Sequence, residues 1–334
     1  MTEPASASLM SLISGYWISQ SIYVAAKLGL ADLIKDKPQT AESLATATDT
    51  HAEALYRLLR ALASVGIFSE DDQHRFALTP TAEGLLSDGE GSQRALAIMA
   101  GEEHYASWSE LLYSIRTGQS AFEKVYGAPI FDWLGWHPEK AALFDAAMVG
   151  VHGRETGAMA TAYDFSGIHV LADVGGGNGS LLRGVLPKFP KLRGMLCDLP
   201  GVIERAVPLI AEAGLSDRLR TVPTDFFVEV PSGADAYLMR HIIHDWDDGK
   251  SLEILRNVRR VIPAAGRLLV VEGVVPAGNG PSFTKQLDLN MLVIPGGKER
   301  TEEEYRALYD AAGFKLTSIT PTAAEVSVIE GRPV

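Results

Sequence analysis

The stretch Leu171-Ala-Asp-Val-Gly-Gly-Gly-Asn-Gly179 decides the fold of this chain. The short apolar run from His169 to Val174 predicts a buried strand, and a helix-like segment starts at Ser180, directly after the glycines. Strand, glycine turn and helix, in this order, are how an open α/β sheet presents a nucleotide-like cofactor at the carboxyl end of its first strand. The stretch therefore predicts a doubly wound, Rossmann-like sheet.

The spacing of the glycines bears on which cofactor binds. A dinucleotide fingerprint requires G-x-G-x-x-G. Gly175 and Gly177 fit its first two positions, but Ser180 stands at the sixth, and Gly179 comes one residue early. This shorter turn favours a cofactor without a pyrophosphate, and S-adenosylmethionine is the candidate. The alternative is a glycine-rich loop without a ligand, and the residues downstream bear on that choice.

Length and composition limit the class of protein. The chain has 334 residues, enough for about two domains, and 46% of them are hydrophobic, which is ample for a buried core. Cys197 is the only cysteine, so no internal disulfide forms, and we expect a buried structural thiol in a reducing, cytoplasmic environment. The net charge of −12 argues against nucleic acid as a partner.

The N-terminus carries no recognisable targeting signal. Met1-Thr-Glu-Pro4 lacks the basic region of a secretory signal. Residues 5–26 are uncharged and long enough to span a bilayer, but their many serines make them too polar for hydrocarbon. We expect instead a largely apolar helix over residues 9–28 that a partner subunit covers in a homodimer.

The next segment has the pattern of a winged helix. A helix is predicted from Thr40, and a second one is predicted from a capping box at Thr50 and Glu53 to Gly66. Ile67-Phe68 and residues 75–78 then flank a polar turn, as in a hairpin. Residues 1–100 are therefore expected to form an α-helical winged-helix domain, and residues 101–334 the cofactor-binding domain.

A winged helix also raises the possibility of a DNA-binding regulator, and charge bears on it. Residues 1–100 hold seven Lys and Arg against twelve Asp and Glu, a balance of −5. The wing would carry Glu70, Asp71 and Asp72, which repel phosphate. We therefore interpret this module as a dimerisation domain that does not bind nucleic acid.

Residues 101–165 are predicted to be mainly helical and are unusually aromatic. Two interpretations stay open: a connector that packs on the sheet, or a lid that lines a pocket for a flat aromatic substrate. Strands and helices alternate from His169 onward, which predicts a largely parallel sheet. Only Pro321 to Ala324 separate the last two strand-like runs, at 314–320 and 325–330, so these should pair antiparallel.

Three acidic residues follow consecutive predicted strands. Asp173 precedes the glycine turn, Asp198 ends the second strand, and Asp225 follows the third. An acid about 20 residues past the glycines can accept hydrogen bonds from both ribose hydroxyls. Asp225 is placed to take an adenine amino group while Phe226 covers the ring. Because all three lie at carboxyl ends of strands, they favour an adenosine-containing cofactor.

His244 follows the fourth strand, on the cofactor side of the sheet, and is a candidate general base. The competing interpretation is a metal site, made of His241, His244, Asp245, Asp247 and Asp248. A calcium loop that starts at Asp245 would need an acid at its twelfth position, where Arg256 stands. Asp247 and Asp248 are better explained as helix caps, and we expect no metal.

Two glutamates are candidate partners of that histidine. Glu272 ends the fifth strand, and Glu299 lies in Pro295-Gly-Gly-Lys-Glu-Arg-Thr. A carboxylate at imidazole Nδ1 fixes the tautomer, raises the basicity of Nε2 and stabilises the imidazolium that forms. Glu299 taken alone would also fit a surface charge before the next helix.

These residues together resemble a known family. The chain is similar to the small-molecule O-methyltransferases typified by plant caffeic acid, flavonoid and acetylserotonin enzymes, with many bacterial relatives, from its N-terminal helices to its end. The most specific matches are Asp173-Val-Gly-Gly-Gly-Asn-Gly, Asp198-Leu-Pro, Asp225-Phe-Phe, His244-Asp-Trp and Gly296-Gly-Lys-Glu-Arg-Thr. The resemblance implies an S-adenosylmethionine enzyme of class I methyltransferase fold with a winged-helix dimerisation domain.

The resemblance also implies roles for single residues. It assigns the cofactor to Asp173, Gly175, Gly177, Asp198, Asp225, Phe226 and Arg240, the last at a position where plant members have lysine. It makes His244 the base with Glu272 and Glu299 as its carboxylate partners. It places Met148, Met291, Asp288 and Asp245 around the aromatic acceptor. Because some relatives keep the cofactor but hydroxylate, decarboxylate or rearrange their substrates, that chemistry is the alternative to methyl transfer.

Overall fold

The computed structural model describes residues 9–89 and 91–334, so the Met1 to Pro4 segment and the start of the uncharged run lie outside the described residues. The chain forms two compact units, one of Met1–Ala106 with His137–Val151 and one of Ser107–Trp136 with His152–Val334. Residues 101–165, expected to form one helical connector or lid, thus contribute to both units. The domain limits 1–100 and 101–334 stay predictions.

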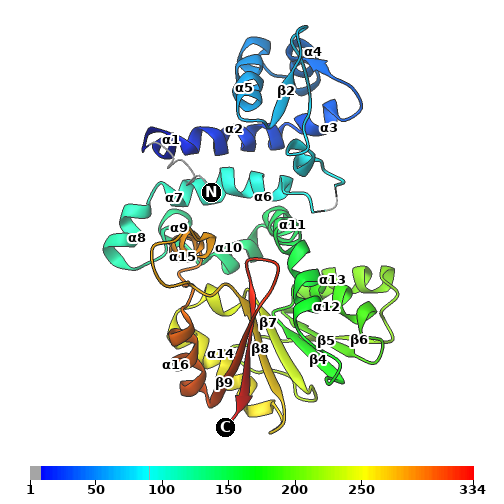
Figure 1. The fold of residues 1–334 in the computed structure, drawn as a ribbon, viewed down its shortest axis with the longest axis vertical. Helices are drawn as coiled ribbons and strands as arrows, with labels where there is room; N and C mark the ends of the chain where they lie inside the picture. Colours follow the sequence, from blue (N-terminus) through cyan, green and yellow to red (C-terminus); the bar gives the residue numbers. More distant parts are fainter. Residues whose placement is uncertain (1–8, 90) are drawn as a thin grey trace, which may run out of the picture. The chain divides into compact units, whose positions relative to one another are not determined.

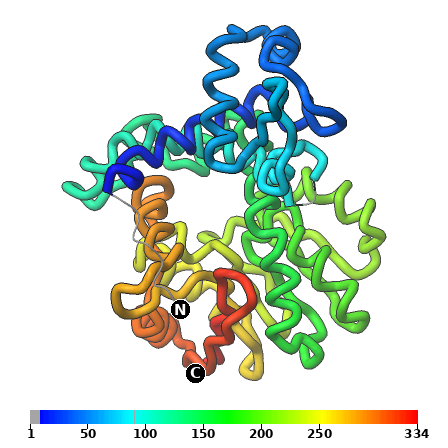
Figure 2. Tube along the Cα trace, turned by 45° about the horizontal axis from the view of Figure 1, so that its top comes forward, coloured from blue at the N-terminus to red at the C-terminus, as the bar shows by residue number. Residues whose placement is uncertain are grey.

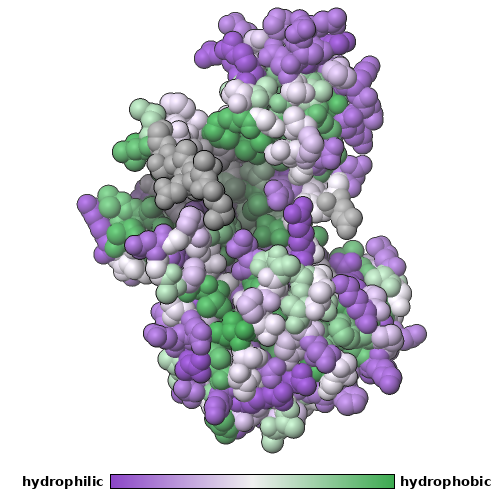
Figure 3. All heavy atoms as spheres, in the orientation of Figure 1, coloured by the Kyte–Doolittle hydropathy of each residue, from purple (hydrophilic) through white to green (hydrophobic). Residues whose placement is uncertain are grey.

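The helix expected over residues 9–28 is interrupted. It consists of α1 (Leu9–Ile13) and α2 (Gly15–Lys27), and α3 (Leu30–Ile34) follows after Gly29, whose backbone is left-handed. Apolar side chains of α1 and α2 gather on the surface (Figure 3). The most exposed are Leu9, Met10, Leu12, Ile13 and Trp17. Within the described residues, no helix is long and apolar enough to cross a membrane.

A winged-helix arrangement follows, as predicted. Helices α4 (Ala41–Thr48) and α5 (Ala52–Ser64) precede the β2–β3 hairpin (Phe68–Glu70 and Arg75–Leu78), and β1 (Gln39–Thr40) pairs antiparallel with β3. Leu59, Leu62, Phe68 and Phe76 are buried between them. The expected capping box is wrong. Helix α5 starts later, and His51, not Thr50, is its N-cap and accepts the N–H of Ala54.

The segment up to the cofactor domain is mainly helical, as expected. After a 3₁₀ turn (Ala82–Leu85), its helices are α6 (Arg94–Met99), a π-helical turn (Ala100–His104), α7 (Tyr105–Trp108), α8 (Leu111–Thr117), α9 (Ala121–Tyr126), α10 (Ile130–Trp136) and α11 (Pro138–Ala162). Ser120 caps α9 and also donates a hydrogen bond to the carbonyl of Ile294 at 2.7 Å. This bond ties α9 to the end of α15 within the second unit.

The second unit is built on a seven-stranded sheet (Figure 1). The strands are β4 (Val170–Val174), β5 (Arg193–Asp198), β6 (Leu219–Pro223), β7 (Ala236–Arg240), β8 (Arg267–Glu272), β9 (Phe314–Pro321) and β10 (Ser327–Pro333), in the order β6-β5-β4-β7-β8-β10-β9. The first five are parallel, and β10 pairs antiparallel with β8 and β9. The doubly wound sheet and its antiparallel end confirm the predicted fold.

Helices pack on both faces of this sheet because strand residues point alternately to either side. They are α12 (Ser180–Val185), α13 (Pro200–Glu212), α14 (Asp248–Val261) and α16 (Glu302–Ala312), whereas α15 (Phe283–Val293) packs against α8 and α9. Leu171 lies in the core with α12 and α13, while its neighbour Ala172 lies in the core with α14 and α16. Both ribbon and tube show the C-terminal hairpin, in red, beside α16 (Figures 1 and 2). Cys197 is buried in the second core, as expected, and burial raises its pKa to about 12.

Candidate active site

The glycine turn that follows β4 is built for close approach. Gly175 and Gly177 have φ of 72° and 58°, the left-handed region that side chains rarely adopt. A Cβ at Gly175 would lie 2.5 Å from the terminal methyl carbon of Ile242, so a larger residue would displace that side chain as well as strain the backbone. The N–H of Gly177 donates to Oδ2 of Asp198 at 2.8 Å. The turn and the end of β5 thus form one rigid edge.

Asp173 lies at the base of this turn and is almost completely buried. Its Oδ2 has no hydrogen-bond partner among the described residues. Burial raises the pKa of Asp173 to about 7, against the opposing effect of the Arg240 guanidinium. A buried acceptor without a donor costs free energy unless a ligand supplies one. The site therefore fits the cationic amino group of an amino-acid-like cofactor such as S-adenosylmethionine.

Arg240 ends β7 on the other side of the turn. Its guanidinium donates to the hydroxyl of Thr156 at 2.9 Å and to that of Ser180 at 3.2 Å. These bonds join α11, the start of α12 and the sheet. Arg240 is thus held by side chains around the predicted cofactor position, and the hydrogen-bond acceptors found for it in the described part of the chain are two hydroxyls and the carbonyl of His152.

The two downstream acids lie at the ends of neighbouring strands, as expected. Asp198 accepts N–H groups from Gly177 and from Leu199, the latter at 2.7 Å, which fixes its carboxylate in place. Asp225 accepts the N–H of Phe227 at 2.9 Å, and the rings of Phe226 and Phe227 are 5.0 Å apart. Both acids thus bring a carboxylate to the ends of neighbouring strands, and carboxylate oxygens are acceptors for hydroxyl and amino groups.

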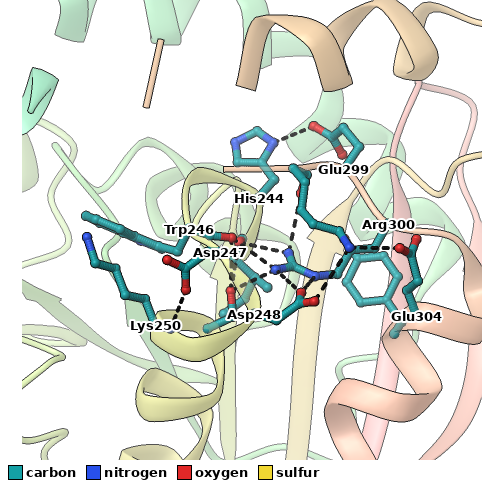
Figure 4. Close-up of polar contacts among 12 residues, drawn as sticks. His244, Trp246, Asp247, Asp248, Lys250, Glu299, Arg300 and Glu304 are labelled. Atoms are coloured by element: carbon teal, nitrogen blue, oxygen red, sulfur yellow. Dashed lines mark hydrogen bonds and ion pairs between the residues drawn. The ribbon is translucent and has the colours of Figure 1, made fainter. Parts of the chain in front are cut away.

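His244 lies in the 3₁₀ turn η4 (Ile243–Asp245) between β7 and α14 and is buried. Its Nδ1 is 2.7 Å from Oε1 of Glu299 (Figure 4). With the proton on Nδ1, Nε2 presents an unprotonated lone pair, and it lies 3.6 Å from Oδ1 of Asp245. This is the arrangement of a general base whose tautomer a carboxylate fixes.

Glu272 contributes in a different way from Glu299. It is completely buried at the end of β8, and its Oε1 accepts the backbone N–H groups of Ile242 and His244, both at 3.1 Å. Its Oε2 accepts the hydroxyl of Tyr305 at 2.5 Å. Glu272 thus fixes the backbone of the turn that carries His244, whereas Glu299 binds its ring.

The charges around the imidazole shift its protonation. Burial by itself lowers the pKa of His244, but the carboxylates of Asp245, Glu299 and Glu272 outweigh it and raise the pKa to about 10. Burial raises the pKa of Asp245 to about 7 and also raises the pKa of Glu299. The imidazole is therefore cationic at neutral pH, and Nε2 presents a lone pair only after the ring has lost one of its two protons. A positive charge placed beside it would lower its pKa and favour the basic form.

Arg300 is a buried residue of this site that the sequence reasoning overlooked. Its guanidinium donates to the carbonyls of Ile243 and Trp246, both at 3.0 Å, to Oδ1 of Asp248 at 2.9 Å and to the hydroxyl of Ser251 at 3.0 Å (Figure 4). These groups surround the His244 turn. The sequence does contain a signal for Arg300, because it directly follows Glu299 in the motif Gly296-Gly-Lys-Glu-Arg-Thr.

The expected helix caps are half right. Asp247 is the N-cap of α14 and accepts the N–H of Lys250 at 2.9 Å, as predicted. Asp248 instead pairs with Arg300. The difference arises because α14 starts at Asp248, so only the residue before it has a free N-cap geometry.

Residues expected around the acceptor lie on several elements. Asp288 of α15 accepts the N–H of Glu299 at 2.9 Å, and Met291 is buried on the same helix. Asp245 directly follows His244. Met148 lies on α11, within the stretch that belongs to the first unit, so its role stays a prediction. Phe131 of α10 packs 5.7 Å from the ring of Trp246, two residues after His244.

A second polar cluster adjoins the first. Nε2 of His241 lies 3.0 Å from the carboxylate of Glu155, and the ring of His152 stacks on that of His241. The ring centroids of His241 and His244 are 4.9 Å apart. The sequence suggests His241 only as a member of the competing metal site with His244 and the aspartates that follow it. His152 and Glu155 were missed, although their spacing of three places them on one face of a helix.

Comparison with known proteins assigns the family. Residues 108–315 match the O-methyltransferase domain, and residues 10–88 match the O-methyltransferase dimerisation domain. Phenazine O-methyltransferase PhzM of Lysobacter antibioticus is 46% identical over 99% of this chain and 97% of its own. The neocarzinostatin O-methyltransferase NcsB1, solved with S-adenosylmethionine and 2-hydroxy-5-methyl naphthoic acid, is 34% identical with a TM-score of 0.87 over 99% of this chain and 100% of its own.

A third relative is named for a different activity. Aclacinomycin 10-hydroxylase RdmB of Streptomyces purpurascens is 38% identical over 89% of this chain and 81% of its own. The family itself is nevertheless shown: this chain belongs to the O-methyltransferase family. It is an S-adenosylmethionine-dependent O-methyltransferase of class I fold with an N-terminal dimerisation domain, as the motifs predicted.

Proposed function

We propose that this enzyme methylates a phenolic hydroxyl of a small aromatic molecule, with His244 as the general base. The observation that carries the proposal is the 2.7 Å bond from Nδ1 of His244 to Glu299. It leaves Nε2 as the group that removes the hydroxyl proton. Both residues are buried and therefore shielded from water. Electrostatic interactions between charged groups are stronger in such surroundings than in water.

The chain's own residues account for the proton transfer. Bound S-adenosylmethionine supplies a methyl group on a positively charged sulfur, which is a good leaving group. Nε2 of His244 takes the proton from the acceptor hydroxyl, and the carboxylates of Glu299 and Asp245 stabilise the imidazolium that forms. Glu272 holds the turn so that Nε2 keeps its position. A positioned base of this kind contributes about 10²–10⁴-fold to the rate.

The residues at the ends of the first three strands are proposed to hold the cofactor. Asp198 binds the ribose hydroxyls, and Asp225 and Phe226 bind the adenine. Asp173, with the turn at Gly175 and Gly177 and with Arg240 nearby, binds the amino-acid end. The support is the carboxylate oxygen of Asp173 that has no hydrogen-bond partner among the described residues, and the left-handed backbone of Gly175, which strains any larger residue.

A small aromatic acceptor is supported by the surroundings of His244. The rings of Phe131 and Trp246, together with the apolar side chain of Met291, lie on elements that meet at this turn. Met148, Asp245 and Asp288 are proposed as further acceptor contacts. The names of the relatives point the same way, because a phenazine and a naphthoic acid are both flat polycyclic aromatics.

We infer that the enzyme is a homodimer joined through its N-terminal domain. The exposed apolar side chains of α1 and α2 need cover, because contiguous apolar surface of this kind marks interaction sites. The match to a dimerisation domain over residues 10–88 supports this interpretation.

The alternative function is cofactor-dependent chemistry without methyl transfer, such as hydroxylation, and the relative named as a hydroxylase favours it. The test is to incubate the purified enzyme with methyl-labelled S-adenosylmethionine and a panel of phenols. We expect labelled product and an equal amount of S-adenosylhomocysteine, both lost in His244→Ala. A hydroxylated or decarboxylated product that carries no label would establish the alternative.

A further inference from the structure

The cluster of His152, Glu155 and His241 has no part in the proton transfer described above. Glu155 and His152 come from α11, and His241 comes from the residue after β7. Glu155 is buried, and the side chain of His241 is nine-tenths buried. A carboxylate and two imidazoles in such surroundings lose free energy of hydration, so they need partners of matching chemistry.

The backbone of His241 is held in an unusual conformation. Its φ is 54°, in the left-handed region that few residues other than glycine adopt. Such strain persists where surrounding contacts impose it, and it is concentrated at functional sites. Here Glu272 accepts the N–H of the next residue, Ile242, at 3.1 Å. The strained turn therefore brings a second histidine, His241, close to His244, with 4.9 Å between the ring centroids.

One nitrogen of His241 is left without a partner. Nε2 lies 3.0 Å from the Glu155 carboxylate, which only accepts hydrogen bonds when ionised, so Nε2 carries the proton. Nδ1 is then a bare lone pair, and it is buried without a hydrogen-bond partner among the described residues. Burial, with the nearby charges of His244 and Arg240, keeps the pKa of His241 well below its usual value. The ring is thus a neutral hydrogen-bond acceptor.

A metal ion fits this cluster poorly, although its ligand-type atoms lie within 4.8 Å of one another. The rings of His152 and His241 are stacked, 4.1 Å apart and only 12° from parallel. The lone pairs of an imidazole lie in its ring plane, so those of two stacked rings do not converge on one point. Arg240, which donates to the carbonyl of His152 at 3.4 Å, adds a positive charge that opposes a cation.

We propose that His241 forms a binding subsite for a second polar group of the aromatic acceptor, an O–H or N–H next to the hydroxyl that is methylated. The ring centroids of His241 and His244 are 4.9 Å apart, so one flat molecule reaches both with hydrogen bonds of about 2.8 Å. Glu155 fixes the tautomer, and His152 supports the ring by stacking. The acceptor class is thereby narrowed to vicinal diols and aminophenols. This inference rests on the proposed function.

The test compares two probes that differ in one donor. These are 2,3-dihydroxynaphthalene and 3-methoxy-2-naphthol, titrated by calorimetry into the full-length enzyme saturated with S-adenosylhomocysteine. Leaving the buried nitrogen without a donor costs about 1–3 kcal/mol, so the diol should bind roughly 5- to 150-fold more tightly. His241→Phe keeps a ring for stacking but has no nitrogen, and it should bind both probes alike.

Two further variants guard against misfolding at the strained position. In Glu155→Gln the amide oxygen still accepts the Nε2 proton, so the preference for the diol should persist. Glu155→Leu frees the tautomer and should weaken the preference. His169→Gln, at an exposed histidine on the start of the sheet, is the matched control and should behave as the wild type.

The possible outcomes distinguish a failure of the proposed His241 subsite from a failure of the proposed methyl transfer. Equal binding of the two probes, binding of neither, or a preference that survives His241→Phe would overturn the subsite. So would tight binding of Zn²⁺ that is lost in His241→Phe and Glu155→Leu, because the cluster would then be a metal site. Methyl transfer to both probes without preference removes only the subsite. A preference in binding without any methyl transfer supports the subsite and removes the proposed reaction.

Discussion

Nδ1 of His244 and Oε1 of Glu299 lie 2.7 Å apart, although 55 positions separate the two residues in the chain. The histidine comes from the turn after β7, and the glutamate comes from the loop between α15 and α16. Their backbones are fixed independently, by Glu272 for His244 and by Asp288 for Glu299. The proposed base and its carboxylate partner are therefore positioned before any acceptor binds.

Replacing Glu299 by glutamine should test that pair. The amide oxygen of Glu299→Gln still accepts the Nδ1 proton, but the negative charge that stabilises the imidazolium is gone. We expect kcat to fall by about 10-fold or more with little change in KM, because the charge acts mainly in the transition state. Steady-state kinetics measures both. Glu304→Gln, at an exposed residue in the first turn of α16, is the control, and equal kcat values in both variants would contradict the assignment.

The pH dependence of the reaction follows from the pKa of His244, which is raised to about 10. Below that pKa the imidazole is protonated and unable to accept a proton, so kcat/KM should rise as pH increases. In Glu299→Gln one of the charges that raise the pKa is missing, and the inflection should move to lower pH. A profile of kcat/KM that is flat between roughly pH 6 and pH 9 would contradict His244 as the base.

The cofactor site is tested most directly at Asp198. Removing its carboxylate in Asp198→Ala deletes the acceptor for the ribose hydroxyls and also frees the N–H of Gly177. Loss of charged hydrogen bonds of about 1.5–3 kcal/mol predicts affinity for S-adenosylmethionine lowered roughly 10- to 150-fold in calorimetry. The exposed Asp310→Ala is the matched control, and unchanged affinity in Asp198→Ala would remove this residue from the site.

Arg300 should matter for stability as well as for activity. In Arg300→Met the carbonyls of Ile243 and Trp246 lose this donor, and Asp248 loses the nearer of its two cationic partners. Unsatisfied buried groups of this kind cost about 1–3 kcal/mol each, so urea unfolding should show a loss of about 2–5 kcal/mol. Arg306→Met, which removes an exposed ion pair on α16, should cost less than about 1 kcal/mol. Similar losses in the two variants would refute the role of Arg300.

The proposed dimer depends on apolar side chains of the N-terminal helices. The double variant Leu12→Glu, Trp17→Glu places charges on the exposed face of α1 and α2, where burying them would be costly. We expect the wild type to sediment as a dimer and this variant as a monomer. Val228→Glu, at an equally exposed apolar residue of the second unit, should stay dimeric. A wild-type monomer, or a dimer that resists the double variant, would exclude this interface.

Much of the fold was readable from local patterns. The alternation of strands and helices after His169 predicted the sheet, and the short link at Pro321 predicted its antiparallel end, because hydrophobic periodicity and turn residues act over a few positions. The predicted capping box at Thr50 was wrong, because such local patterns do not determine the exact residue at which a helix starts. One residue more or less at a helix start changes the cap without changing the pattern.

The site was predictable wherever its residues follow strands. Asp173 and Asp198 lie near the carboxyl ends of β4 and β5, and Asp225 and His244 follow β6 and β7, so the order of parallel strands predicted that all four lie at one edge of the sheet. The roles of the glutamates were harder to divide. From the sequence, either glutamate was a candidate partner of the imidazole. Only the packing of the loop after α15 shows that Glu299 binds the ring of His244, whereas Glu272 binds its backbone.

By itself, then, the sequence determined the sheet, the glycine turn and the acids that follow it, because each depends on neighbours within a few residues. Tertiary structure alone decided that Arg300 closes the His244 turn and that Glu155 and His152, on a helix that precedes the sheet, lie against His241. Such contacts depend on how distant elements pack, and no local pattern records that. The glycine turn marks where the cofactor is expected, and these long-range contacts shape the surroundings of the base.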